Sequence, residues 1–92
     1  MADQTVRRHV TVRGDVQGVN FREFTRSKAA EAGVSGWVTN RSDGDVEAVF
    51  EGSAGAVDEL VEFCRQGPAA ATVDDVEVQD EEPEGITGFE VR

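Results

Sequence analysis

The stretch Gly14-Asp15-Val16-Gln17-Gly18-Val19-Asn20-Phe21-Arg22 joins an alternating strand pattern to a helical pattern through two glycines and ends on an arginine. Glycines let successive backbone N–H groups turn toward one point, and the positive end of the following helix favours an anion there. An arginine in the first helical turn adds paired donors for phosphate oxygens. The stretch therefore predicts a small-phosphate site. The alternative is a tight strand-to-helix turn followed by a solvated Arg22.

The same stretch does not fit two common nucleotide-binding motifs. No Gly-Lys-Ser/Thr follows it, so the lysine for a triphosphate and the hydroxyl for magnesium are both missing. Its glycine spacing also differs from the dinucleotide fingerprint. The stretch is therefore neither an ATP-binding P-loop nor a dinucleotide-binding loop.

Period-two alternation of apolar and polar residues predicts strands on both sides of the glycine stretch. The clearest lie at residues 6–13, 34–39 and 46–51, and weaker patterns lie at 73–78 and 89–91. The Arg41-Ser42-Asp43-Gly44 stretch predicts a hairpin turn, which makes the two strands beside it antiparallel neighbours. The Asp74-Asp75 pair indicates an irregularity in the fourth strand.

Two stretches carry helical periodicity. The first helix places Phe21, Thr25, Ala29 and Ala32 on one side and stops at Gly33. The second follows Ser53 as its N-cap, and its apolar residues recur at i, i+3, i+4 and i+7 as Val57, Leu60, Val61 and Cys64.

The order β-α-β-β-α-β predicts a single α+β domain over residues 1–92 with the ferredoxin-like sandwich fold. We expect an antiparallel sheet of four to five strands with both helices on one face. The other face is then left for water. The acidic run Asp80 to Glu84 predicts a solvated loop.

Acidic residues outnumber basic ones by 19 to 9, which gives a formal net charge of -10 and leaves Lys28 as the single lysine. Such a surface repels nucleic acid and anionic membranes, so we expect neither as a partner. It also repels itself unless salt screens it. The composition therefore favours the cytosol of a halophile over an ordinary acidic protein.

The single cysteine, Cys64, allows no intrachain disulfide and gives no metal-site spacing, which fits a reducing compartment. Residues 1–6 lack the apolar run of a signal peptide, and no stretch approaches the roughly 20 apolar residues that span a bilayer. We expect a cytoplasmic protein.

The Gly14–Arg22 stretch closely resembles the signature of the acylphosphatase family, and Gly36-Trp37-Val38-Thr39-Asn40 resembles the family's second element. The resemblance runs over nearly the whole chain and includes the Asp43-Gly44 turn, the Gly67-Pro68 break and the closing residues 89–92. It implies one acylphosphatase-like domain over residues 1–92. Two positions depart from the pattern: Asp15 stands where a basic residue is usual, and Asn20 where a glycine or an aromatic is usual.

The resemblance implies a role for each site residue. Arg22 would clamp the phosphoryl group, and Asn40 would hold a water in line with the phosphorus. The phosphate-binding loop would consist of Asp15, Val16, Gln17, Gly18, Val19, Asn20, Phe21 and Arg22. Without the resemblance, Arg22 could equally be a surface arginine paired with Glu23 or Glu31, and Asn40 a residue that caps its own turn.

The activity so implied is metal-independent hydrolysis of small acyl phosphates by a monomer. No other residue pattern competes with it. His9 and Cys64 lie too far apart in the chain to predict a metal site or a dyad, so His9 is interpreted as a sheet-face residue. Asp43 and Asp45 bracket a turn glycine and predict a solvated turn more than a magnesium site. Trp37 and Phe89 are interpreted as packing residues rather than stacking platforms for RNA bases.

Two rival interpretations remain at this stage. The first is a non-catalytic module of the same fold that binds phosphate or a small metabolite, which Asp15 favours because a carboxylate in a phosphate loop repels the ligand. The second is a detached relative of the acylphosphatase-like domain of hydrogenase-maturation carbamoyltransferases.

Overall fold

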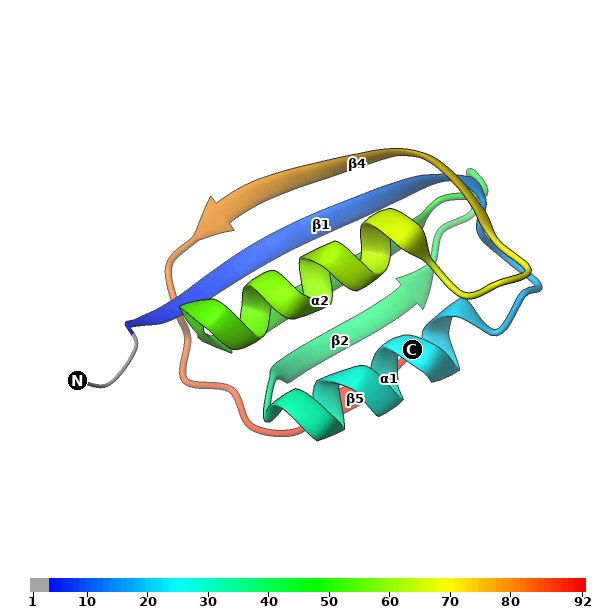
Figure 1. Cartoon of the computed structure of the whole chain (residues 1–92). Coiled ribbons are helices and arrows are strands. Elements are labelled where there is room, and N and C mark those ends of the chain that lie inside the picture. Colours follow the sequence, from blue (N-terminus) through cyan, green and yellow to red (C-terminus); the bar gives the residue numbers. More distant parts are fainter. Residues whose placement is uncertain (1–3) are drawn as a thin grey trace.

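The computed structural model describes residues 4–92, so the first three residues of the predicted domain lie outside it. The chain forms, in order, β1 (Thr5–Asp15), α1 (Phe21–Ala32), β2 (Ser35–Asn40), β3 (Val46–Ser53), α2 (Ala54–Gln66), β4 (Thr72–Glu81) and β5 (Phe89–Val91) (Figure 1). The predicted order β-α-β-β-α-β is confirmed, with the short fifth strand after it.

The five strands make one sheet in the order β4-β1-β3-β2-β5. The antiparallel expectation holds for the first four strands, but it is wrong for β5, which pairs with β2 in parallel. The reason lies in residues 82–88, which leave β4 at one edge and cross one end of the sheet to the other edge (Figure 1). A chain that crosses at that end must turn back along the sheet, in the direction that β2 already follows.

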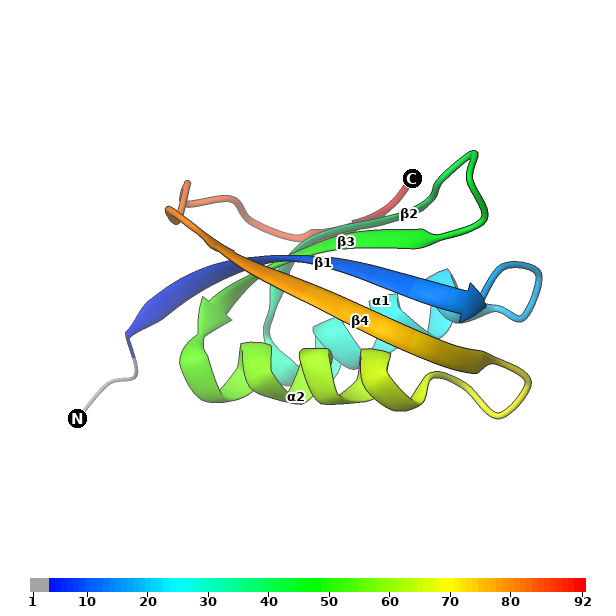
Figure 2. The same cartoon turned by 90° about the horizontal axis from the view of Figure 1, so that it is seen from above.

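Both helices cover the same face of the sheet, as predicted (Figure 2). The α1 helix buries Phe21, Thr25 and Ala29, and α2 buries the four apolar residues expected of it. The α2 helix begins as the sequence predicts, because the Ser53 hydroxyl accepts a hydrogen bond from the Ala56 amide at 3.4 Å. Between helices and sheet lies one core in which the small Val and Ala side chains outnumber the larger ones.

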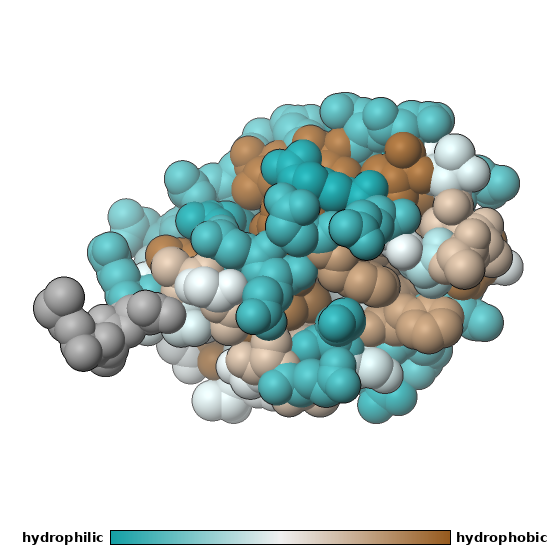
Figure 3. All heavy atoms as spheres, in the orientation of Figure 1, coloured by the Kyte–Doolittle hydropathy of each residue, from teal (hydrophilic) through white to brown (hydrophobic). Residues whose placement is uncertain are grey.

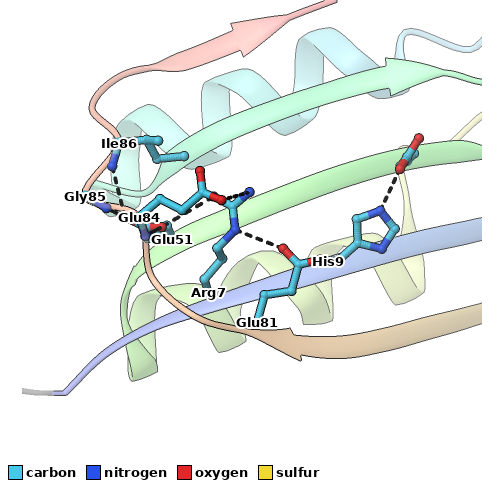
Figure 4. Close-up of polar contacts among 8 residues, drawn as sticks. Arg7, His9, Glu51, Glu81, Glu84, Gly85 and Ile86 are labelled. Carbon is cyan, nitrogen blue, oxygen red and sulfur yellow. Dashed lines mark hydrogen bonds and ion pairs between the residues drawn. The ribbon is translucent and has the colours of Figure 1, made fainter.

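The helix-free face is not simply left for water, and this corrects the prediction. Arg7, Thr11 and Glu51 lie on it with only 8%, 6% and 4% of their surface exposed. Glu51 accepts hydrogen bonds from three consecutive backbone amides, those of residues 84, 85 and 86, at 2.9, 2.8 and 3.1 Å (Figure 4). The crossing segment is thereby fastened over this part of the face.

An ion-pair cluster completes this arrangement. The Arg7 guanidinium pairs with Glu51 at 3.4 Å, Glu81 at 2.9 Å and Glu84 at 3.7 Å (Figure 4). Burial alone would raise the pKa of Glu51, but the backbone amides and Arg7 outweigh it, and the pKa lies below its ordinary 4.5. The acidic run predicted as a solvated loop is therefore partly strand, up to Glu81, and partly bound by Arg7.

The predicted irregularity in the fourth strand is confirmed as a bulge. Arg13 lies opposite Asp75 and Gly14 opposite Val73, so Asp74 is the extra residue. The close approach requires glycine at position 14, whose φ is 135°, because a Cβ there would lie 2.2 Å from the carbonyl oxygen of Thr72. The bulge therefore lies on β4, beside the point where β1 enters the glycine stretch.

The surface on the helix side is mostly hydrophilic, and tan and brown apolar side chains show between the teal ones, including over α1 (Figure 3). Neither α1 nor α2, with 12 and 13 residues, is long enough to cross a membrane, and within residues 4–92 no helix qualifies.

Candidate active site

A cavity of about 180 Å³ opens where the glycine stretch, the start of α1 and the end of β2 meet. Liquid water occupies about 30 Å³ per molecule, so the cavity has room for a phosphoryl group and a water. Seven residues line it: Val16, Gly18, Asn20, Phe21, Arg22, Glu23 and Asn40. The two residues that the sequence singled out, Arg22 and Asn40, thus meet in one cavity although they lie on different elements.

The backbone of the glycine stretch turns through two left-handed residues before α1 begins. Gly18 has φ 74°, and Asn20 has φ 64° and ψ 24°. This accounts for Asn20 where a glycine is usual, because asparagine is among the residues that tolerate this conformation best. The Asn20 side chain makes no capping bond, so the first N–H groups of α1 remain available for an anion.

Gln17 ties the glycine stretch to the β2–β3 turn. Its side-chain Nε2 donates to the carbonyl oxygens of Arg41 at 2.7 Å and Asp45 at 3.0 Å. The turn follows Asn40 directly, so this clamp holds the loop beside the end of β2. Sequence reasoning placed Gln17 among the phosphate-binding residues and missed the clamp, since nothing local in the sequence links Gln17 to Arg41.

Arg22 is half-buried in the first turn of α1 and is the cationic residue of the cavity lining. Its Nη1 donates to the carbonyl oxygen of Arg92 at 2.7 Å. Within residues 4–92, Arg22 does not form the ion pair with Glu23 that is expected of a surface arginine. Glu23 pairs instead with Arg26 at 2.9 Å. A guanidinium has five N–H donors, so several remain for phosphate oxygens.

The end of the chain is itself held in place. The Arg92 amide donates to the carbonyl oxygen of Val38 at 2.8 Å, and the Arg92 guanidinium lies over the Trp37 ring, 4.8 Å from its centroid. Trp37 therefore packs, as predicted, but against the Arg92 guanidinium on the helix-free face. Phe89 stacks on Phe50 with their ring centroids 5.9 Å apart.

Asn40 is the last residue of β2 and lies opposite Val46. Its side-chain oxygen Oδ1 is closed off from solvent and has no hydrogen-bond partner among residues 4–92. An unsatisfied buried amide oxygen is costly, about 1–3 kcal/mol, and usually indicates a bound water or ligand. A capping role does not account for this oxygen, because a cap would accept from the backbone of its own turn.

Of the predicted phosphate-binding loop, Val16, Gly18, Asn20, Phe21 and Arg22 line the cavity, and Asp15, Gln17 and Val19 lie outside its lining. Asp15 is exposed and pairs with Thr72 at the end of β1. Its carboxylate therefore gives weaker support to a non-catalytic module than the sequence suggested. Glu23 also lines the cavity, although it was not among the predicted site residues. Its position in the first turn of α1, next to Arg22, was the sequence feature that could have indicated this.

The other titratable residues among positions 4–92 give no second reactive cluster. His9 lies on the sheet face as predicted, with Nε2 2.6 Å from the Glu47 carboxylate. Asp43 accepts from the Asp45 amide at 3.1 Å, as in a solvated turn. Complete burial raises the pKa of Cys64 to about 12, which keeps the thiol unreactive. No group of three or more His, Cys, Asp or Glu side chains in residues 4–92 is arranged to hold a metal ion.

Fold and cavity together define a small ferredoxin-like α+β protein with a cavity at a helix N-terminus that an arginine lines. The sequence pattern of the acylphosphatase family matches residues 8–91. An acylphosphatase from Rubrobacter xylanophilus is 60% identical over 92 residues, which cover 99% of this chain and 84% of that protein. One from Haloarcula marismortui is 57% identical over 86 residues, 94% of each chain. The structure of an acylphosphatase from Coxiella burnetii matches with a TM-score of 0.91 and 43% identity, over 96% of this chain and 93% of that one.

The chain belongs to the acylphosphatase family. It is an acylphosphatase in its activity as well, because relatives of this identity and coverage carry that activity in their names. The family, the fold and the hydrolysis of acyl phosphates predicted from the two motifs are confirmed, and the non-catalytic binding module is the weaker interpretation.

Proposed function

We propose that Arg22 and the backbone amides of the glycine stretch hold the phosphoryl group of the acyl phosphate while Asn40 orients the attacking water. One observation carries this assignment: Asn40, whose side-chain Oδ1 is buried without a hydrogen-bond partner among residues 4–92, lines the same cavity as Arg22. A water held by the Asn40 side-chain amide would stand beside the bound phosphoryl group.

The reaction needs only positioning and charge stabilisation. The water oxygen forms a bond to phosphorus as the bond between phosphorus and the acyl oxygen breaks, and the acyl group leaves as a carboxylate. An amide is too weak a base to take the proton, so the proton passes to a phosphate oxygen. Arg22 and the helix N-terminus stabilise the negative charge of the phosphoryl oxygens throughout.

The composition of the cavity lining fits this scheme. A carboxylate is a good leaving group, so no general acid is required. The seven lining residues include no serine, threonine, cysteine or histidine. The carboxylate among them, that of Glu23, is paired with Arg26 at 2.9 Å. We accordingly propose direct attack by water, independent of a metal ion or other cofactor.

The cellular setting belongs to the same proposal. One hydrophobic cluster joins both helices to the sheet, which supports a single acylphosphatase-like domain over residues 1–92. We propose that this domain works as a monomer. The net charge of -10 supports a protein that binds no nucleic acid. The same acidity supports the cytoplasm of a halophile, where salt screens the self-repulsion.

Phosphate release from acetyl phosphate tests the proposal. The assay uses molar KCl to screen the surface charge and an excess of EDTA to remove divalent metals. We expect turnover that EDTA leaves unchanged. Loss of turnover on adding EDTA, with recovery on adding magnesium, would contradict the metal-independent scheme.

A further inference from the structure

Phe24 is an apolar side chain with an unusual position. Among residues 4–92 it is the one large hydrophobic side chain exposed to solvent, with 50% of its surface accessible. It lies on α1, one turn after the helix begins, where apolar side chains also reach the surface in Figure 3. A ligand that covered this side chain would gain the favourable burial of apolar surface.

Phe24 lines a hollow of about 210 Å³ together with Asn20, Glu23 and Ser27. Asn20 and Glu23 also line the phosphate cavity, so the two hollows share a boundary. Asn40 lines the phosphate cavity but not the hollow that contains Phe24. The hollow with Phe24 thus extends the candidate active site past Asn20 and Glu23, and Asn40 does not reach it.

In-line displacement decides what would occupy this hollow. The attacking and leaving oxygens lie on opposite sides of the phosphorus. If Asn40 holds the water, the acyl oxygen departs from the side of the phosphoryl group that faces away from Asn40. The hollow with Phe24 borders the cavity at Asn20 and Glu23, and Asn40 does not line it. This hollow is therefore the space available for the acyl group.

We propose that Phe24 and its neighbours form the acyl subsite and that this subsite selects acyl phosphates with an uncharged aromatic or aliphatic acyl group. The inference rests on the proposed roles of Arg22 and Asn40. Phe24 supplies an apolar surface on which an aromatic ring packs well. Glu23 places a carboxylate at the boundary of the two hollows, and this carboxylate repels acyl groups that carry a second negative charge.

The experiment compares three substrates: acetyl phosphate, benzoyl phosphate and succinyl phosphate, whose acyl groups are small, aromatic and anionic. The readout is the ratio of kcat/KM values between two substrates of one protein, because this ratio cancels any general loss of activity. We expect the wild-type protein to prefer benzoyl over acetyl and acetyl over succinyl phosphate. Phe24→Ala should lower the benzoyl-to-acetyl ratio about three- to tenfold, mainly through KM, and Phe24→Leu should lower it less.

Glu23→Gln tests the charge selection, and Glu31→Gln is its matched control because Glu31 is an exposed carboxylate of the same helix outside both hollows. Glu23→Gln should raise the succinyl-to-acetyl ratio about two- to fivefold, and Glu31→Gln should leave it unchanged.

If Phe24→Ala changes kcat/KM for acetyl and benzoyl phosphate by the same factor, their ratio stays unchanged and the acyl subsite is overturned. The proposed mechanism of hydrolysis is not affected by that result. If Asn40→Ala hydrolyses acetyl phosphate like the wild type, Asn40 does not fix the side from which water attacks, and the proposed function fails together with the acyl subsite.

Discussion

The Arg22 side chain donates a hydrogen bond of 2.7 Å to the carbonyl oxygen of Arg92, 70 positions further along the chain. β5 in turn is held against β2, and the Arg92 amide bonds to Val38. The orientation of the proposed phosphate-binding cation therefore depends on the last strand of the sheet. This relationship explains why a parallel strand of only three residues matters to the site.

Replacing Arg22 with lysine keeps the positive charge but removes the planar fork of donors. The lysine ammonium has three donors but no rigid plane that directs them at the Arg92 backbone oxygen and two phosphate oxygens together, so Arg22→Lys should lower kcat for acetyl phosphate about a hundredfold or more. Circular dichroism should show an unchanged fold. Near-normal turnover in a folded variant would rule out this role for Arg22.

Asn40→Ala separates binding from chemistry. Arg22 and the loop amides remain, so the variant should bind inorganic phosphate with about the wild-type affinity but lose nearly all hydrolysis. Isothermal titration measures the first quantity and phosphate release the second. A parallel loss of affinity and turnover would instead make Asn40 a structural residue of the β2–β3 turn.

Glu51→Gln should make the stability of the fold less dependent on pH. The native pKa of Glu51 lies below its ordinary 4.5, so its ionised form stabilises the fold above that pH, and the gain is lost as pH falls through the native pKa. Near neutral pH the variant should lose about 1–3 kcal/mol of unfolding free energy, because Gln keeps one acceptor but loses the charge that Arg7 and the amides bind.

Urea unfolding from neutral pH downward measures this difference, which should shrink as the acid range is entered. Glu82→Gln is the control, since Glu82 is an exposed residue of the same crossing segment. A wild-type advantage that stays constant at every pH would show that the Glu51 charge is not what fastens the segment.

Salt should stabilise the protein. Surface charges interact over about 10 Å in 0.1 M salt but only about 3 Å in 1 M. Screening weakens individual ion pairs as well, yet with 19 acidic residues against 9 basic ones the repulsion outweighs these attractions. A gain of about 1 kcal/mol on raising KCl between these concentrations would raise Tm by about 4–8 °C. A Tm that falls as KCl rises would contradict the halophile proposal.

Local patterns were sufficient to predict the two helices and the positions of the five strands, although not the direction of β5. Ser53 and Gly33 mark helix ends through chemistry that involves only their immediate neighbours, and the Val57–Cys64 periodicity identifies the buried face of α2. The glycine stretch predicted the cavity for the same reason, because its left-handed residues and the helix start follow each other in sequence.

The features that were missed depend on residues far apart in the chain. Glu51 binds the amides of residues 84–86, more than 30 positions away, and the direction of β5 follows from that crossing segment. Gln17 similarly binds a turn 24 and 28 positions away. A carboxylate that binds backbone amides leaves no trace in the composition of those residues, so a single sequence cannot reveal the contact.

Hydrolysis of acetyl phosphate in ¹⁸O-labelled water, with EDTA present, tests the central claim most directly. If a water beside Asn40 attacks phosphorus, every turnover places one labelled oxygen in the released phosphate and none in the acetate. Mass spectrometry of the two products measures both. Label in the acetate would mean that water attacks the carbonyl carbon, and it would contradict the roles proposed for Arg22 and Asn40.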